Sequence, residues 1–208
     1  MNETLYYDQG YFCSTIDKNI ETILWNEIYS TDWKQDDVEH IYKEIPVWYE
    51  ASKKYNLQED GSNRADYERL IGEDIFSKTP KTLIDVGYSL LQTPQFDFFK
   101  KYYKTPQLKY IDLWNGSEDI PYHFDTINGC DTLVLIYLTD QPWDADWGGS
   151  ITMKKQVDSN ILYENKVLPN NATMLVVNNA NPLVFHKVEK LKNKDINRYT
   201  FSFIYKWF

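Results

Sequence analysis

The sequence contains only two cysteines among its 208 residues, Cys13 and Cys130. Two thiols make neither a disulfide framework nor a cysteine-rich zinc site, and they fit a reducing cytoplasm. The N-terminus lacks the basic and apolar segments of a signal peptide, and the longest apolar run, residues 133–138, is too short to span a bilayer. We therefore expect a cytoplasmic protein with no membrane partner.

Positive charge is also scarce. The chain has 22 Lys and Arg against 31 Asp and Glu, which gives a net charge of −9, and no run of Lys or Arg is longer than two residues. Nucleic-acid binding usually needs clustered positive charge, so this partner class is disfavoured. Aromatic residues, by contrast, make up 16% of the chain, with 17 Tyr and 7 Trp. This content favours a β-rich core, a lined pocket, or both.

The first half of the chain has helical periodicity after an irregular, tyrosine-rich opening at residues 1–14. Apolar residues from Ile16 to Ile28 recur at helical spacing, and Thr15 or Asp17 can cap the helix. Further helices are expected at residues 35–45, 66–76, 82–91 and 95–103.

The second half changes to short apolar runs separated by turn residues, including Asn-Gly at 115–116 and 128–129. The expected strands are 107–114, 119–125, 131–138, 148–154, 161–168, 173–178, 183–188 and 197–206. Such strands predict a β-sandwich or barrel, with the helices bracing one face. We expect one domain (1–208) of the α+β class, in which residues 1–104 are mainly a helical support and residues 105–208 form the core.

The most informative motif is His-x-Asp at His123 and Asp125. The chain has only three histidines, and a second one, His186, follows later in the sequence, whereas His40 lies in a polar helical context. Residues i and i+2 of a strand point to the same face, so His123 and Asp125 can reach one metal ion. Two imidazoles and one carboxylate are the ligand set of non-haem Fe(II) oxygenases, and His186 on a neighbouring strand would complete it.

The order of the motifs resembles that of Fe(II)/2-oxoglutarate-dependent dioxygenases, most closely the prolyl 4-hydroxylase type. The resemblance covers roughly residues 107–208. It rests on His123-x-Asp125 and on further segments at Trp114-Asn115-Gly116, Ile136-Tyr137-Leu138-Thr139, Trp143-Asp144, Gly148-Gly149-Ser150-Ile151, His186-Lys187-Val188 and Arg198-Tyr199-Thr200-Phe201-Ser202. Two departures are that Trp114 replaces a family tyrosine and that the gap between His186 and Arg198 is longer than usual.

This resemblance implies a double-stranded β-helix, or jelly-roll barrel, of about eight strands. It implies that His123, Asp125 and His186 are the catalytic metal ligands for Fe(II). It also implies that Arg198, Tyr137 and Thr200 bind 2-oxoglutarate, where the planar guanidinium can hold a carboxylate bidentately. The resemblance further implies that O2 is the oxidant, with ascorbate as a candidate stimulant. It also implies a reaction that couples decarboxylation of 2-oxoglutarate to succinate with C–H hydroxylation, and the presence of Asp125 favours hydroxylation over halogenation.

Several substrates stay open, because fold and cofactor do not fix the substrate. The first hypothesis is a prolyl residue of a protein or peptide, and the alternative is a free amino acid or other small metabolite. Nucleic-acid demethylation fits the net charge poorly, and a non-catalytic barrel used for binding is a hypothesis of another class. Two loops also have alternative interpretations: residues 141–147 are either a lid or a packed aromatic loop, and Gly148-Gly149 is more simply a strand-entry turn.

Overall fold

The structure is a computed structural model that describes residues 2–30, 81–101, 106–114, 119–123, 131–181, 183–193 and 195–207, with the backbone alone for 106–114. The helices expected at 35–45 and 66–76 therefore lie outside the described residues, as do His40, Asp125 and Cys130. None of the described helices is long and apolar enough to span a membrane.

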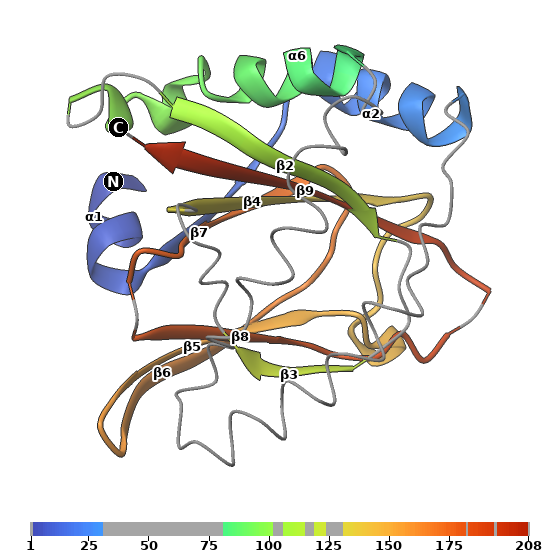
Figure 1. Ribbon diagram of the computed structural model, residues 1–208. Helices are drawn as coiled ribbons and strands as arrows, with labels where there is room; N and C mark the ends of the chain where they lie inside the picture. Colours follow the sequence, from blue (N-terminus) through green and yellow to red (C-terminus); the bar gives the residue numbers. More distant parts are fainter. Residues whose placement is uncertain are drawn as a thin grey trace, which may run out of the picture.

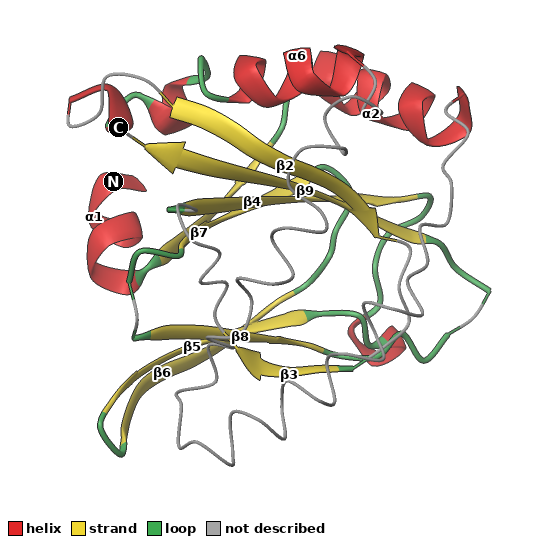
Figure 2. Ribbon diagram, viewed as in Figure 1, coloured by secondary structure: helices red, strands yellow, loops and turns green. Residues whose placement is uncertain are grey.

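Two antiparallel sheets face each other, and helices cover the outer side of the larger one (Figures 1 and 2). The larger sheet has the order β1-β7-β4-β9-β2, formed by Tyr11–Thr15, Thr173–Asn178, Thr132–Thr139, Arg198–Trp207 and Pro106–Trp114. The smaller sheet has the order β3-β8-β5-β6, formed by Ile120–His123, Val184–Val188, Ile151–Val157 and Asn160–Val167. Two facing antiparallel sheets with few helices are consistent with a jelly-roll-like fold.

Strand β4 shows why the larger sheet forms the centre of the molecule. All eight residues of Thr132–Thr139 are buried. Its apolar side chains alternate between two cores, because Val134, Ile136 and Leu138 pack on the helix side while Leu133 and Leu135 pack between the sheets. A strand covered on both faces has an apolar sequence without polar alternation, and this strand has that sequence.

The covering helices present apolar stripes to the larger sheet. Helix α2 (Lys18–Ser30) begins after Asp17, whose carboxylate accepts hydrogen bonds from the N–H groups of Asn19 and Ile20 at 2.8 and 3.0 Å. The predicted Asp17 cap is therefore confirmed. The helices α2 and α6 (Lys81–Leu90) bury the residues Ile20, Leu24, Ile28, Leu83, Val86 and Leu90 against the sheet.

All eight predicted strands are present, with shifts of one to three residues at some ends. The expectation that residues 1–14 are irregular is wrong. A short helical segment, α1 (Asn2–Thr4) and η1 (Leu5–Gln9), ends at Gly10 with a φ of 91°, and β1 then pairs with β7 from Tyr11 opposite Val177. The strand depends on a partner distant in sequence, so local periodicity did not reveal it.

The helix expected over residues 95–103 is wrong in the part that the structure describes. Two tight turns, η2 (Pro94–Phe96) and η3 (Phe99–Lys101), replace it. Phe96, Phe98 and Phe99 are all buried, and the Phe99 ring stacks on Trp207 with centroids 4.2 Å apart. Residues 96 and 98 lie on different sides of an α-helix, so a regular helix could not bury all three rings on one face.

Candidate active site

The two predicted histidine ligands lie directly opposite each other on neighbouring strands of the smaller sheet. His123 ends β3 and pairs in register with His186 of β8. The side chains are 8% and 3% exposed, and the ring centroids are 4.2 Å apart with 57° between the ring planes. A pair of adjacent, buried imidazoles of this kind can supply two nitrogen ligands to one ion.

A backbone contact orients the His123 ring. Its Nδ1 lies 2.8 Å from the carbonyl oxygen of Pro121. Because a carbonyl oxygen can only accept, Nδ1 must carry the hydrogen in this contact. A neutral ring of this tautomer has its lone pair on Nε2, the atom through which it could ligate a metal ion.

The third predicted ligand, Asp125, lies outside the described residues. Within the part of the chain that the structure describes, no group of three or more His, Cys, Asp and Glu side chains could hold a metal ion. The structure thus brings two of the three predicted metal ligands together.

The three residues predicted to bind the cosubstrate lie on the larger sheet. Tyr137 of β4 is the register partner of Thr200 on β9, and Thr139 is the partner of Arg198. Tyr137 packs in the core between the two sheets. Thr200 is its direct partner and Arg198 is two residues away on the same strand, so all three side chains face the smaller sheet. All three are buried.

The Tyr137 and Thr200 hydroxyls are suited to binding a polar group. Burial raises the pKa of Tyr137 above its ordinary value, an effect that the nearby positive charge of Arg198 opposes. Tyr137 is therefore a neutral phenol and a hydrogen-bond donor at neutral pH. The Thr200 Oγ1 atom is fully buried and makes no hydrogen bond within the described residues. A buried hydroxyl without a partner is costly, and a bound carboxylate would satisfy it.

The backbone of a Gly-Gly turn holds the Arg198 guanidinium. Arg198 Nη1 donates to the carbonyl oxygen of Gly149, just before β5. Gly149 has a φ of +67°, and a Cβ atom there would lie 3.3 Å from Arg198 Nη1 and 3.0 Å from Trp143 Cζ2. Both glycines have a positive φ just before β5 begins, which fits the predicted strand-entry turn, and Gly149 also contacts the predicted cosubstrate residue.

In the loop over residues 141–147 the two tryptophans, Trp143 and Trp147, pack against neighbouring side chains, whereas residues 141–142 and 144–146 are exposed. Trp143 lies in a small apolar cluster with Leu191 and Ile196, and its indole N–H donates to the Gly148 carbonyl oxygen at 3.2 Å. The structure favours the packed aromatic loop over the lid for this segment. The cluster closes one side of the turn that holds Arg198.

A second loop is tied to this turn by Glu189. Its carboxylate accepts from the Ser150 hydroxyl at 2.5 Å and pairs with Lys166 at 2.8 Å. Lys166, followed by Ser150, lowers the pKa of Glu189. The start of the segment between His186 and Arg198, which is longer than is usual in the family, is therefore linked to the smaller sheet at Glu189.

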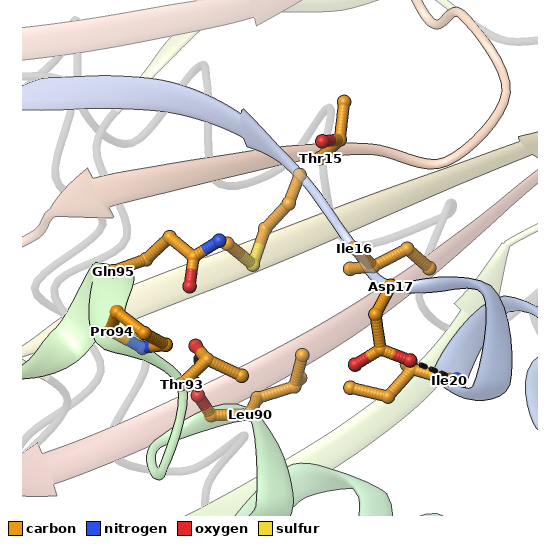
Figure 3. Close-up of a pocket in the computed structure, with 9 residues that line it drawn as sticks. Thr15, Ile16, Asp17, Ile20, Leu90, Thr93, Pro94 and Gln95 are labelled. Atoms are coloured by element: carbon orange, nitrogen blue, oxygen red, sulfur yellow. Dashed lines mark hydrogen bonds between the residues drawn. The ribbon is translucent and has the colours of Figure 1, made fainter.

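A cavity of about 140 Å³ lies away from these residues, on the helix side of the larger sheet (Figure 3). Its wall includes Asp17, Leu90, Gln95 and Met174. The side chains of Tyr137 and Thr200 face the other way, so this cavity is separate from the candidate active site.

The comparisons with known proteins agree with this fold. No family model and no curated protein matches the sequence. The structure is similar to a prolyl hydroxylase from Trichoplax adhaerens in complex with a hypoxia inducible factor oxygen degradation domain peptide fragment. The TM-score is 0.52 at 16% identity, over 99% of this chain and 86% of that chain.

Two other solved structures have lower TM-scores. A prolyl-4-hydroxylase from Pseudomonas putida has a TM-score of 0.48 at 13% identity, over 99% of this chain and 94% of that chain. An oxidoreductase of the 2OG-Fe(II) oxygenase family from Burkholderia pseudomallei has a TM-score of 0.42 at 16% identity. That match covers 62% of this chain, which spans 59% of the Burkholderia chain. The resemblance inferred from the sequence is confirmed as a likeness in fold to the Trichoplax enzyme.

Two contacts that shape this site have no signal in the sequence. The Pro121 carbonyl oxygen that orients His123 and the Gly149 carbonyl oxygen that holds Arg198 are both backbone atoms. Backbone acceptors occur in every residue, so residue identity alone gave no signal for either contact. The Gly148-Gly149 pair did indicate a special backbone conformation, and Gly149 is where the contact occurs.

Proposed function

We propose that the protein is an Fe(II)- and 2-oxoglutarate-dependent oxygenase and that its two sheets form a double-stranded β-helix. The observation that carries this proposal is the buried pair His123 and His186, whose rings lie side by side, with the His123 ring oriented through its Nδ1 by the Pro121 carbonyl oxygen. The chain does contain a carboxylate at Asp125, two residues after His123, which fits the third ligand position.

In this proposal His123, His186 and Asp125 would hold the iron, and the bound metal would supply the activation of O2, one atom of which goes to a C–H bond as a hydroxyl group and the other to succinate as 2-oxoglutarate loses CO2. Arg198 binds the distal carboxylate of 2-oxoglutarate, and Tyr137 and Thr200 donate hydrogen bonds to it. The Thr200 hydroxyl is buried and makes no hydrogen bond within the described residues, which supports this assignment. Burial of Arg198 excludes water, which strengthens its attraction to a carboxylate.

We propose further that the substrate is a prolyl residue of a protein or peptide. The support is the likeness in fold to the Trichoplax prolyl hydroxylase, whose structure contains a peptide. A small metabolite is the alternative substrate and would need a second charged anchor beside the metal. The cytoplasmic location stays a prediction.

Succinate formation from 2-oxoglutarate tests the proposal directly. The protein would be assayed with and without Fe(II), against proline-containing peptides, free amino acids and short oligonucleotides, with ascorbate varied separately. Iron-dependent succinate formation stimulated by a proline peptide, but not by its alanine counterpart, would support the prolyl hydroxylase. Stimulation by a free amino acid would select the alternative. No iron-dependent succinate under any condition would contradict the proposal and favour a binding protein.

A further inference from the structure

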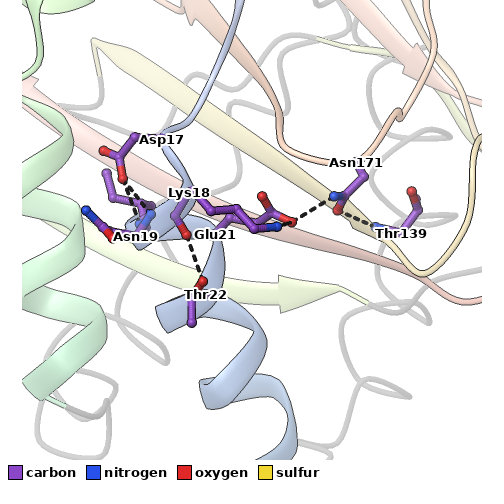
Figure 4. Close-up of polar contacts among 8 residues, drawn as sticks. Asp17, Lys18, Asn19, Glu21, Thr22, Thr139 and Asn171 are labelled. Carbon is purple, nitrogen blue, oxygen red and sulfur yellow. Dashed lines mark hydrogen bonds and ion pairs between the residues drawn. The ribbon is translucent and has the colours of Figure 1, made fainter.

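A chain of polar contacts links helix α2 to the end of strand β4 (Figure 4). The Glu21 carboxylate on α2 accepts hydrogen bonds from Lys18 Nζ and Asn171 Nδ2, both at 2.9 Å. The other end of the Asn171 side chain, Oδ1, accepts from the backbone N–H of Thr139 at 3.2 Å. Thr139 is the last residue of β4 and lies opposite Arg198 in register. The chain therefore reaches the strand position beside the proposed cosubstrate residue.

The Asn171 side chain supplies a hydrogen-bond acceptor at a position where β7 has no residue to pair with β4. β7 begins at Thr173, which pairs with Tyr137, so β4 extends two residues beyond the end of its β7 partner. Thr139 is only 4% exposed, and a buried backbone N–H needs an acceptor. The Asn171 side chain supplies that acceptor from the turn that precedes β7, and it thereby continues the ladder to the end of β4.

Glu21 determines which end of the Asn171 amide faces β4. A carboxylate only accepts hydrogen bonds, so Asn171 must turn its Nδ2 toward Glu21 and its Oδ1 toward Thr139. Glu21 is 6% exposed, and the hydrogen bond from Lys18 is the largest of the effects that lower its pKa, so it is ionised at neutral pH. Without this carboxylate, the amide could turn over and place a donor against the Thr139 N–H.

We infer that Glu21 and Asn171 are positioning residues for 2-oxoglutarate, because they fix the end of β4 and so the placement of Tyr137 and of Arg198. This inference rests on the proposed function. The histidine pair lies on the other sheet and makes none of these contacts. Loss of the link therefore weakens 2-oxoglutarate binding and leaves metal binding unchanged.

The test exchanges the hydrogen-bond donor and acceptor between Glu21 and Asn171. Asn171→Asp places a second carboxylate against Glu21, and we expect about tenfold weaker 2-oxoglutarate binding, the loss typical of one hydrogen bond to a charged group. The double variant Glu21→Gln/Asn171→Asp restores one donor and one acceptor between the residues, and the introduced aspartate still accepts from Thr139. We expect its affinity to return to within about threefold of wild type.

The measurements are 2-oxoglutarate affinity by anaerobic titration of the metal-loaded protein, metal affinity, and hydrogen–deuterium exchange of the Thr139 amide. Exchange should be faster in Asn171→Asp and slow again in the double variant. Thr22→Ala is the matched control, because the Thr22 hydroxyl on the same helix is exposed and bonds only to the Lys18 carbonyl oxygen among the described contacts. Asn171→Ala replaces Asn171→Asp in the comparison if the latter does not fold.

The outcomes separate this inference from the proposed function. Wild-type affinity in both Asn171→Asp and Asn171→Ala, or an equal loss in Asn171→Asp and the double variant, would overturn the positioning role. A parallel loss of metal affinity would overturn it too, because it would show general damage to the fold. If wild-type protein itself does not bind 2-oxoglutarate, the proposed function fails, and the inference fails with it.

Discussion

Among the described residues, the larger sheet is covered on both faces, by helices on one side and by the smaller sheet on the other (Figure 1), whereas most outward-facing side chains of the smaller sheet, such as Lys154, Phe185 and Lys187, are only partly buried. On that outer face Lys154 Nζ lies 4.0 Å from the centre of the Tyr122 ring, and Lys187 Nζ lies 4.9 Å from it. The two histidines lie on the inner face of this half-exposed sheet. Arg198 and Tyr137 lie on the fully covered one.

In the proposed function the two sheets therefore meet two different requirements, one for binding the cosubstrate and one for binding the metal. The carboxylate of a cosubstrate needs a buried positive charge, and a sheet covered on both faces provides a dry setting for Arg198. The histidines are buried to a similar degree, at 8% and 3% exposure against 5% for Arg198, but a metal ligand also needs a fixed ring orientation, which the Pro121 carbonyl oxygen provides for His123 on a short strand. Substitutions on the two sheets should therefore fail in different ways.

Removal of either histidine should have the largest effect. His123→Ala or His186→Ala should lower iron-dependent turnover by more than about 100-fold, because even outer-shell partners of metal ligands contribute 10–100-fold. The unfolding midpoint of the metal-free protein should change little. Lys187→Ala, next to His186 but directed outward, is the control and should retain activity. Full activity in both histidine variants would disprove the metal assignment.

The same residue type on the two sheets should differ in its contribution to stability. Phe203 of β9 is fully buried on the helix side, whereas Phe185 of β8 is only partly buried, below Lys154. We expect Phe203→Ala to lower the free energy of unfolding by about 3–5 kcal/mol and Phe185→Ala by about 1 kcal/mol. Urea denaturation measures both, and equal losses would show that the two sheets are not covered as described.

Gly149→Ala should affect the cosubstrate residue selectively. The added Cβ would press on Trp143 and Arg198, and alanine disfavours the backbone φ of +67°. We expect the KM for 2-oxoglutarate to rise by about fivefold, corresponding to about 1 kcal/mol, with iron affinity unchanged. An unchanged KM would mean that Gly149 does not help to place Arg198.

The smallest effect is expected on the outer face of the smaller sheet. Lys154→Ala removes a cation from above the Tyr122 ring, and we expect it to lower the free energy of unfolding by about 0.5–1 kcal/mol. Turnover and KM should match wild type. A loss of activity here would show that the outer face takes part in the reaction.

The sequence predicted those parts of the molecule that depend on local pattern. Periodicity predicted every strand from β2 to β9, and the Asp17 cap marked the start of α2. The interpretation of His123 and His186 as ligands of one metal ion required them to lie on neighbouring strands, and the structure has them there. The order of motifs along the second half also predicted the fold that the chain shares with a solved prolyl hydroxylase.

The features that the sequence did not predict depend on contacts between distant residues. Strand β1 forms because it pairs with the edge strand β7. The tight turns after Thr93 form because this arrangement buries all three phenylalanines. The contact between Gly149 and Arg198 and the one between Glu21 and Asn171 join residues that are 49 and 150 positions apart. No local pattern encodes such pairs. The place of Asp125 in the metal site stays a prediction.

The most direct test of the central claim is the absorption band that Fe(II) and 2-oxoglutarate produce together when both are bound in the absence of O2. We expect the band in wild-type protein only when both are present. It should be absent in His186→Ala, and in Arg198→Ala it should require a much higher concentration of 2-oxoglutarate. A wild-type protein without the band, or a band that persists unchanged in His186→Ala, would contradict the assignment of a metal to one sheet and its cosubstrate to the other.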